Sequence, residues 1–339
     1  MFNLSLISTP PFGMVLVWMG VAVMMLGASL TGAGEEDGAV PAARIARFSG
    51  DKDAAISFTV DDGFKGATDE LTKAFEPFGF KVTWYVNPGP TTEDMTGYKG
   101  RTMWPQWRAL RDAGHEIGNH GLTHANLTQL EAQAAAHEID EAYAQIEKHL
   151  GAPPFSYCPA YGARNEAVDA LIAVKHRAQT GARLFYGGDK WTLEKANRWV
   201  DAAIAKKEWI VPMLHSYSKG YAEFKEPGAF DTHLQYVKEH EARLWVAPFA
   251  TVSKYVRLRD ASKLESRPVA GGVELTLSSE LDTRIFDRPL TVVVDAPGAV
   301  RAEAKRTGRS EPIPARVAEH RILVDLLPGP EPVTVSWSK

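Results

Sequence analysis

Residues 56–63 have the sequence ISFTVDDG, in which an apolar and β-branched run ends in two adjacent carboxylates, Asp61 and Asp62. Such a run before an Asp-Gly turn predicts a β-strand over residues 56–60. Two carboxylates that lose their water together repel each other, and a metal ion resolves the conflict by binding one and leaving the other as a base. A solvated turn is the simpler interpretation of the same residues.

Around this strand, strand-like and helix-like patterns alternate from residue 54 to about residue 259. Further strands are predicted at residues 80–86, 115–118, 184–186, 209–215 and 244–247. Helices are predicted at residues 67–78, 104–113, 130–150, 193–206, 229–240 and 251–259. This alternation predicts an α/β domain with a parallel sheet, either open or closed into a barrel. We favour a barrel, because polar motifs follow the strands and barrel enzymes gather their catalytic groups at that end.

Two further motifs carry histidines. Residues 114–124 (GHEIGNHGLTH) contain His120 and His124, four positions apart, a spacing at which two imidazoles can face one metal ion. One carboxylate with two imidazoles leaves coordination positions for water and substrate. Residues 211–216 (VPMLHS) place His215 at the end of an apolar strand. Taken alone, each motif is more often structural than catalytic.

The pattern changes near residues 262–267. Strand-like runs separated by Gly and Pro turns follow at residues 273–277, 290–294, 300–304, 321–326 and 333–337. Without helical patterns between them, these runs predict a small all-β sandwich, which could bind sugar or serve as a structural appendage. The expected divisions are a signal peptide or anchor at 1–34, a spacer at 35–53, the α/β domain at 54–261 and the all-β domain at 268–339.

Composition and the N-terminus limit the functional classes. The 339 residues have a formal net charge of −4 and no long basic stretch, which argues against a nucleic-acid partner. The one cysteine, Cys158, excludes an internal disulfide. Residues 14–30 are almost wholly apolar and predict a secretory signal peptide or, if uncleaved, a membrane anchor. Either interpretation predicts an exported protein, periplasmic or extracellular.

In their order along the chain, these motifs resemble those of the NodB-type polysaccharide deacetylases, carbohydrate esterase family 4, over residues 54–259. The family's Thr-Phe-Asp-Asp motif matches residues 59–62, its His-(Ser/Thr)-x-x-His motif matches residues 120–124, and its Leu-x-His motif is met by residues 213–215. The resemblance implies a distorted (β/α) barrel, with the sandwich-like domain outside the matched region.

The resemblance also assigns roles. It makes Asp61 the catalytic base and His215 the general acid, and it gives Asp62, His120 and His124 to one divalent metal ion. Zn²⁺ is the expected metal, with Co²⁺ and Ni²⁺ as alternatives. The implied substrate is an acetylated glycan, N- or O-linked.

One family motif is altered. The sequence CPAY stands where the family has Arg-x-Pro-Tyr, so Tyr161 aligns and its backbone N–H would bind the oxyanion, but Cys158 replaces the arginine that pairs with the base. Loss of a charge partner should raise the pKa of Asp61. Arg164 and Arg183 are the candidates to substitute from elsewhere in the chain.

The family's aspartate–tryptophan motif is matched by Asp189 and Trp191, which would make Asp189 the residue that orients His215. The segment 216–226 after His215 is expected to contact the substrate. Aromatic side chains that could stack on sugar rings are Trp84, Trp104, Trp107, Tyr217 and Tyr221.

Other functions stay open at this point. Two histidines and one carboxylate also bind iron in non-haem oxygenases, although Asp61 and His215 would then have no role. A glycan-binding relic of the deacetylase fold would account for the missing arginine. A cysteine nucleophile at Cys158 has no supporting local signature.

Overall fold

The computed structural model describes residues 41–97 and 99–339. The apolar segment at residues 14–30 and the first expected domain division lie outside the described residues. Within the described ranges, no helix has both the length and the apolar character that crossing a bilayer requires.

Parallel β-sheets form the centre of the first domain, as the alternation of strands and helices predicts. The larger sheet has seven strands in the order β7-β6-β5-β4-β3-β10-β8, and a smaller parallel sheet has the order β11-β2-β9. The strands are β2 (Ala54–Ile56), β3 (Thr59–Val60), β4 (Thr83–Val86), β5 (Glu116–Asn119), β6 (Ser156–Tyr157), β7 (Ala178–Gln179), β8 (Leu184–Phe185), β9 (Trp209–Ile210), β10 (Pro212–Leu214) and β11 (Leu244–Val246). Because β7 and β8 are the edges of the larger sheet, the domain is an open, distorted (β/α) barrel, which confirms the predicted fold.

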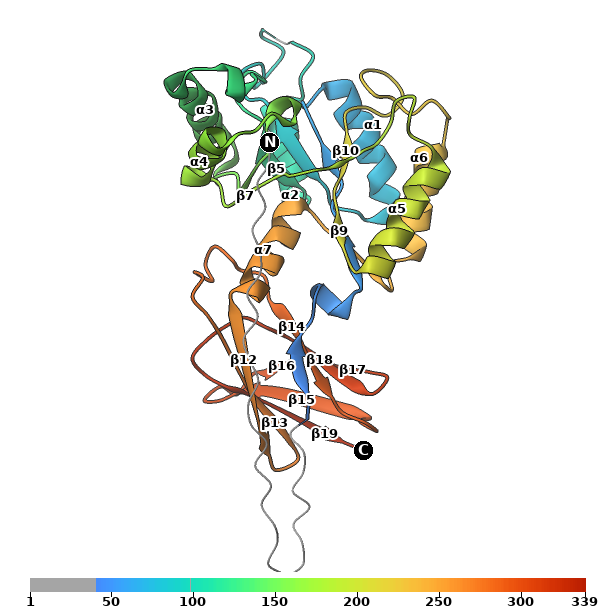
Figure 1. Cartoon of the computed structure of the whole chain (residues 1–339), viewed down its shortest axis with the longest axis vertical. Helices are drawn as coiled ribbons and strands as arrows, with labels where there is room; N and C mark the ends of the chain where they lie inside the picture. Colours follow the sequence, from blue (N-terminus) through green and yellow to red (C-terminus); the bar gives the residue numbers. More distant parts are fainter. Residues whose placement is uncertain (1–40, 98) are drawn as a thin grey trace, which may run out of the picture. The chain divides into compact units, whose positions relative to one another are not determined.

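Helices flank the sheet in Figure 1, with α3 and α4 on one side and α1, α5 and α6 on the other. Their bounds are α1 (Lys65–Phe75), α2 (Trp104–Asp112), α3 (Ala132–Leu150), α4 (Glu166–Lys175), α5 (Leu193–Lys206), α6 (Ala229–Glu239) and α7 (Phe249–Asp260), with 3₁₀ turns at Ser49–Asp51, Glu76–Phe78, Leu127–Gln129 and Ala160–Gly162. Phe58, between β2 and β3, packs against Phe75 of α1 and Phe230 of α6, with ring centroids 5.3 and 6.3 Å apart. Aromatic packing of this kind fixes the strand that leads to Asp61.

The long helix predicted at residues 130–150 starts slightly later than expected. Asn126 caps a separate 3₁₀ turn, Leu127–Gln129, by accepting a hydrogen bond from the Thr128 backbone N–H. Helix α3 then begins at Ala132 and ends at Leu150, before a left-handed Gly151. A short polar side chain can cap a 3₁₀ turn or an α-helix equally well. The sequence alone therefore does not show which of the two begins after Asn126.

The second domain is a two-sheet antiparallel sandwich, as the C-terminal strand pattern predicts. Its sheets have the orders β1-β14-β18-β17 and β12-β13-β19-β15-β16. The strands are β1 (Ala43–Ile45), β12 (Ser262–Val269), β13 (Gly272–Ser279), β14 (Leu290–Asp295), β15 (Arg301–Arg306), β16 (Pro312–Ile313), β17 (Ala315–Ala318), β18 (Arg321–Leu326) and β19 (Val333–Ser338). Alternate residues of β13 and β19 are buried in the apolar core between the sheets.

The sandwich takes its first strand from the segment before the barrel. Strand β1 lies within the expected spacer and pairs with β14, with Ala43 opposite Val294. At the other end of the barrel's chain, β12 follows α7 directly, and the hydroxyl of Tyr255 on α7 donates to the carbonyl of Ala46, 2.9 Å away. The barrel is therefore inserted between two parts of the sandwich. Sequence analysis did not predict this arrangement, because β1 has only three residues and such a short strand shows no recognisable pattern.

A polar network anchors α7 to the N-terminal end of β5. The Glu116 carboxylate accepts hydrogen bonds from the backbone N–H of Ala250, at 2.6 Å, and from the hydroxyl of Thr83, at 2.8 Å. The Thr83 hydroxyl also accepts from the N–H of Phe249, at 2.8 Å. These two side chains satisfy the first free N–H groups of the helix, which has no side-chain cap of its own.

Candidate active site

The C-terminal ends of the parallel strands surround a cavity of about 840 Å³. The predicted site residues that line it follow β3, β5, β6 and β10, which the sheet places side by side or nearly so. They are Asp61, Asp62, His120, His124, Tyr161 and His215. The parallel arrangement therefore brings together motifs that lie up to about 150 residues apart in the chain, as expected for this kind of fold.

Asp62, His120 and His124 form a compact group of potential metal ligands. The Oδ1 atom of Asp62 lies 3.2 Å from Nε2 of His124 and 3.5 Å from Nε2 of His120. The three ligand atoms all lie within 4.8 Å of one another. Asp62 and His124 both have left-handed backbones, with φ of 72° and 69°, a strained conformation that is concentrated at functional sites.

The chemistry of this group fits a divalent metal ion. Oδ1 of Asp62 is buried and has no hydrogen-bond partner of good geometry among the described residues. Burial raises the pKa of Asp62, but the neighbouring His120 and His124 lower it well below its ordinary value. An ionised oxygen without a hydrogen bond, facing two imidazole nitrogens, is costly unless a cation lies between them. One oxygen and two nitrogen ligands with open positions are typical of catalytic zinc sites.

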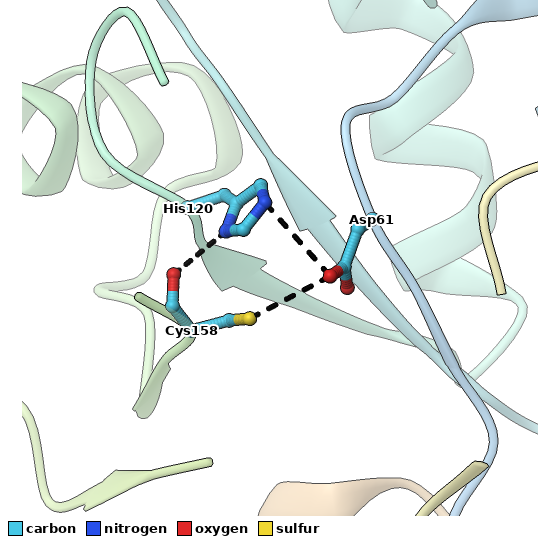
Figure 2. A group of neighbouring side chains, drawn as sticks. All are labelled: Asp61, His120 and Cys158. Atoms are coloured by element: carbon cyan, nitrogen blue, oxygen red, sulfur yellow. Dashed lines mark hydrogen bonds and ion pairs between the residues drawn. The ribbon is translucent and has the colours of Figure 1, made fainter. Parts of the chain in front are cut away.

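The main chain fixes which nitrogen of His120 faces this group. Figure 2 shows the ring between Asp61 and the backbone of Cys158, where Nδ1 lies 2.6 Å from the Cys158 carbonyl oxygen. Because a carbonyl only accepts hydrogen bonds, Nδ1 must carry a proton and donate it. In the neutral ring Nε2 then presents its lone pair towards Asp62, which is how ligating histidines are commonly oriented.

Two polar side chains hold the loop that carries both histidines. The Asn87 amide donates to the carbonyls of His120 and Gly121, at 2.8 and 2.9 Å. Glu138 on α3 accepts from the backbone N–H and the hydroxyl of Thr123, at 2.9 and 2.7 Å. Neither Asn87 nor Glu138 was predicted from the sequence. For Glu138 the reason is that a glutamate in an amphipathic helix gives no sign that it faces inward.

Arg183 supplies the cation that Cys158 cannot provide. Its Nη1 and Nη2 atoms each lie 2.8 Å from an oxygen of Asp61, and both side chains are almost completely buried. The Cys158 thiol lies 3.8 Å from Oδ2 of Asp61, beside the carboxylate but without a positive charge (Figure 2). The other candidate, Arg164, pairs instead with Asp169. The cation beside Asp61 therefore comes from the residue before β8 and not from the position of Cys158 after β6.

This pair decides the ionisation of the proposed base. Burial raises the pKa of Asp61, but Arg183 and then His120 lower it by more, so its pKa lies below the ordinary value. The rise expected from the sequence is therefore wrong, because it assumed that no other arginine reaches the carboxylate. A bidentate guanidinium also restricts the direction in which the carboxylate points.

His215 lies in the cavity, but Asp189 does not orient it. The Asp189 side chain is 90% exposed, and Lys225 is a distant ion-pair partner at 3.9 Å. Nδ1 of His215 is buried and has no hydrogen-bond partner in the described part of the chain. The predicted role of Asp189 is wrong because its carboxylate lies in solvent and forms no hydrogen bond with His215.

The surroundings of His215 favour its neutral form. Burial lowers its pKa, while Asp61 and Asp62 act in the opposite direction without cancelling the effect. Phe185 and Tyr221 contact the ring, with centroids 5.9 and 4.9 Å away.

Tyr161 sits at the mouth of the cavity in the turn Ala160–Gly162. Its backbone is left-handed, with φ of 60°, and its ring lies 4.6 Å from that of His124. A tyrosine in this conformation is strained, which means that the surrounding turn determines the direction of its peptide group. Its assignment to an oxyanion site stays a prediction.

Of the five aromatic residues considered for sugar stacking, only one is exposed. The tryptophans are buried in the barrel core: Trp84, Trp104 and Trp107. Tyr217 is partly buried and donates to Asp231. Tyr221 is 67% exposed at the edge of the cavity.

The fold and the order of the motifs make the first domain similar to the NodB-type distorted (β/α) barrels. Residues 49–180 match the family model described as polysaccharide deacetylase. The resemblance is confirmed over these residues. Residues 181–339 lie outside the match, and they include Arg183, His215 and the strands from β8 onward.

Individual relatives are distant. The chain is 23% identical over 336 residues to a gellan lyase of a Bacillus species, which covers 86% of this chain, and 23% identical over 162 residues to the peptidoglycan deacetylase of Helicobacter pylori, which covers 45%. It spans only 13% and 50% of the lengths of these two proteins. A crystal structure from Mycobacterium smegmatis assigned to the polysaccharide deacetylases has a TM-score of 0.51 at 15% identity, over 68% of this chain and 100% of that one, which shows the shared fold.

Proposed function

We propose that this protein is a metal-dependent hydrolase that removes N- or O-linked acetyl groups from an oligosaccharide or polysaccharide. The observation that carries the proposal is the proximity of two sets of side chains. Asp62, His120 and His124 suit a metal ion, and Asp61, paired with Arg183, keeps an ionised carboxylate beside them. The similarity to a polysaccharide deacetylase family supports an acetylated glycan as substrate.

Asp62, His120 and His124 would hold the ion, for which we propose Zn²⁺, with Co²⁺ or Ni²⁺ as alternatives. A divalent ion there would supply Lewis acidity, which polarises a carbonyl group and makes a water molecule more acidic.

The chain's own groups would move the protons. Asp61 would accept a proton from the attacking water, with Arg183 holding the carboxylate through two parallel hydrogen bonds. The backbone N–H of Tyr161 would donate to the developing oxyanion. His215, which lines the same cavity, would give a proton to the leaving amine or alkoxide from its protonated form, which Asp61 and Asp62 favour against the effect of burial.

The competing functions have less support. A glycan-binding relic was suggested by the loss of the family arginine at Cys158, and Arg183 removes that reason by pairing with Asp61. An iron oxygenase could use the same three metal ligands, but it gives no role to the Asp61–Arg183 pair or to His215.

We also propose that the protein is exported, on the basis of the apolar residues 14–30. Cell fractionation with N-terminal sequencing of the mature chain tests this. A chain cleaved shortly after residue 30 supports a signal peptide, an intact chain in the membrane fraction supports an anchor, and a cytoplasmic intact chain overturns export.

Acetate release from a panel of N- and O-acetylated glycans tests the activity. Wild-type protein loaded with Zn²⁺ should release acetate, and chelated protein should not. His120→Ala should lose the bound metal and the activity together, whereas the exposed His137 on α3 offers a matched control, His137→Ala, that keeps both. Full activity in metal-free His120→Ala, or no acetate from any glycan with zinc bound, would overturn the proposal.

A further inference from the structure

A small hollow lies beside the N-terminal end of β7, away from the residues of the candidate active site. It has a volume of about 210 Å³ and is lined by the C-terminal end of α4, by β7 and by Arg257 of α7. None of its lining residues lines the catalytic cavity. The hollow is therefore a separate space, large enough for a small ion or molecule.

Two buried polar atoms on the wall of this hollow have no hydrogen-bond partner among the described residues. They are Nδ1 of His176 and Oε1 of Gln179. His176 is only 4% exposed. Buried polar atoms are nearly always paired in folded proteins, so two free ones on one wall indicate a polar ligand.

Hydrogen bonds show that Nδ1 of His176 is a donor. Oδ1 of Asn119 accepts from the backbone N–H of Gly121 at 2.8 Å, and its Nδ2 atom lies 3.1 Å from Nε2 of His176. An amide nitrogen only donates, so Nε2 of His176 accepts. Burial lowers the pKa of His176 to about 4, and the neutral ring therefore carries its one proton on Nδ1.

Gln179 presents an acceptor to the same space. Arg164 and then the Gln179 amide lower the pKa of Asp169 by hydrogen bonding to its carboxylate. Because a carboxylate only accepts, the amide nitrogen of Gln179 faces Asp169, and Oε1 is the free atom. Helix α4 also ends beside the hollow, and the free carbonyl groups of its last turn carry partial negative charge. A ligand that fills this hollow must therefore both accept and donate hydrogen bonds.

Two arginines add positive charge. Arg177 and Arg257 line the hollow, and within the described ranges neither has a carboxylate oxygen within 4.0 Å. Arg257 donates from Nη1 to the carbonyl of Arg177, and its guanidinium lies 5.1 Å from the centroid of the Phe286 ring. These contacts position Arg257 without neutralising it. Unpaired guanidinium groups beside a buried N–H donor favour an anion over a neutral molecule.

We propose that this hollow is a binding site for a phosphate group that retains a proton. Its oxygen atoms would accept hydrogen bonds from Nδ1 of His176 and from the guanidinium groups of Arg177 and Arg257. Its remaining O–H would donate to Oε1 of Gln179. Sulfate has the same shape but no proton near neutral pH, so it would face Gln179 with lone pairs only. A water molecule would satisfy His176 and Gln179, but it would leave both positive charges without a counterion.

Titration calorimetry at pH 6 tests the site, in chelated protein so that no metal ion competes for the ligand. Inorganic phosphate keeps a proton at this pH, and His176 stays neutral. Wild-type protein should bind inorganic phosphate at least about tenfold more tightly than sulfate, because one buried acceptor distinguishes them. Glycerol 3-phosphate is the second probe. Tighter binding than that of inorganic phosphate identifies a phosphate ester as the source of the group, and weaker binding identifies free phosphate.

Two variants locate the binding. Gln179→Leu removes the acceptor and should abolish the preference for phosphate over sulfate. Arg257→Ala removes a cation from an exposed position and should weaken both anions about tenfold, with the preference kept. Arg301 on β15 is exposed and lies outside the hollow, so Arg301→Ala serves as the matched control with wild-type affinity.

The remaining outcomes overturn the proposal. If wild-type protein binds no phosphate, the two buried atoms are paired by water only. Phosphate affinity that is the same in wild type and Arg257→Ala would place the anion elsewhere on the protein. An unchanged preference in Gln179→Leu, with folding confirmed by circular dichroism, would show that no proton of the ligand meets Gln179.

Discussion

Two carboxyl groups inside the barrel, Asp61 at the C-terminal end of the strands and Glu116 at the N-terminal end, respond to their surroundings in opposite ways. Burial raises the pKa of Glu116, and its hydrogen bonds from Ser156, Ala250 and Thr83 do not offset this, so its pKa stays above the ordinary value. The pKa of Asp61 lies below the ordinary value.

The difference lies in the charge of the partners. Asp61 faces a guanidinium, whereas the groups that donate to Glu116 are neutral hydroxyl and backbone N–H groups. Neutral donors compensate only part of the cost of removing a carboxylate from water, while a paired cation more than compensates it here. The C-terminal end of the sheet therefore holds a carboxylate that stays ionised. At the N-terminal end, the Glu116 carboxyl group forms hydrogen bonds that hold α7 against β5.

Amide substitutions test this contrast most strongly. Asp61→Asn should reduce kcat for acetate release by about 1,000-fold, because the amide cannot accept the proton and faces Arg183 with a donor. Glu116→Gln should leave kcat within a factor of about two, since it is remote from the reacting groups. The measurement is acetate release at saturating substrate, with folding checked by circular dichroism. Similar losses in both variants would contradict the contrast.

Removal of the cation is the next largest effect. Arg183→Ala should lower kcat by about 100-fold and stability by about 3 kcal/mol, because it leaves the Asp61 carboxylate buried without its partner. Arg183→Lys keeps the charge without the two parallel bonds and should lose less.

Added guanidinium ion at concentrations below those that unfold the protein should partly restore the activity of Arg183→Ala. Arg198 on α5 is exposed and pairs with Glu194, so Arg198→Ala serves as the matched control with unchanged activity. A normal kcat in Arg183→Ala would show that Arg183 does not contribute to the activity.

At the N-terminal end of the sheet, the hydrogen bonds of the Glu116 side chain should contribute more to the unfolding free energy than its charge does. Ser156 forms hydrogen bonds with both Glu116 and the hydroxyl of Tyr85. Glu116→Gln keeps the shape of the side chain and an amide oxygen for its donors, and should cost less than about 1 kcal/mol of unfolding free energy. Glu116→Ala leaves the hydroxyl of Thr83 and the backbone N–H of Ala250 without their partner and should cost about 3 kcal/mol. Denaturant unfolding at pH 7 measures both, and equal costs would show that these hydrogen bonds do not stabilise the fold.

Buried histidines show the same contrast in their pKa values, and the expected effect on stability is the smallest of those considered. Burial lowers the pKa of His176 to about 4 and that of His233 to about 3, while charged neighbours raise the pKa of the equally buried His120 despite burial. A lowered folded-state pKa means that both neutral histidines stabilise the fold above the unfolded value of about 6.5, and this stability is lost as the pH falls below it.

Unfolding free energies measured between pH 7 and pH 4 in chelated protein should therefore decline. His176→Gln, which cannot titrate, should show a shallower decline than wild type. The same slope in both proteins would contradict the assignment.

The elements that sequence analysis predicted well are those whose pattern is local. The helix ending at Leu150 can be recognised from a few neighbouring residues, because apolar periodicity and a terminating glycine act over short distances. The single strand predicted at residues 56–60 is instead divided between β2 and β3, which belong to different sheets. The strand β1 was not recognised, since three residues carry no period and their pairing with β14 depends on a strand about 250 residues later.

The class of fold, the order of the candidate motifs and the three side chains that suit a metal ion could all be predicted from the sequence. Asp62, His120 and His124 could be named because each belongs to a short motif with a fixed spacing. Two features became clear only in the folded structure: Arg183 rather than Arg164 reaches Asp61, and the side chain of Asp189 lies in solvent. Ion pairs between distant strands depend on the path of the whole chain. For that reason, the charge state of the proposed base could be judged only after folding had brought these strands together.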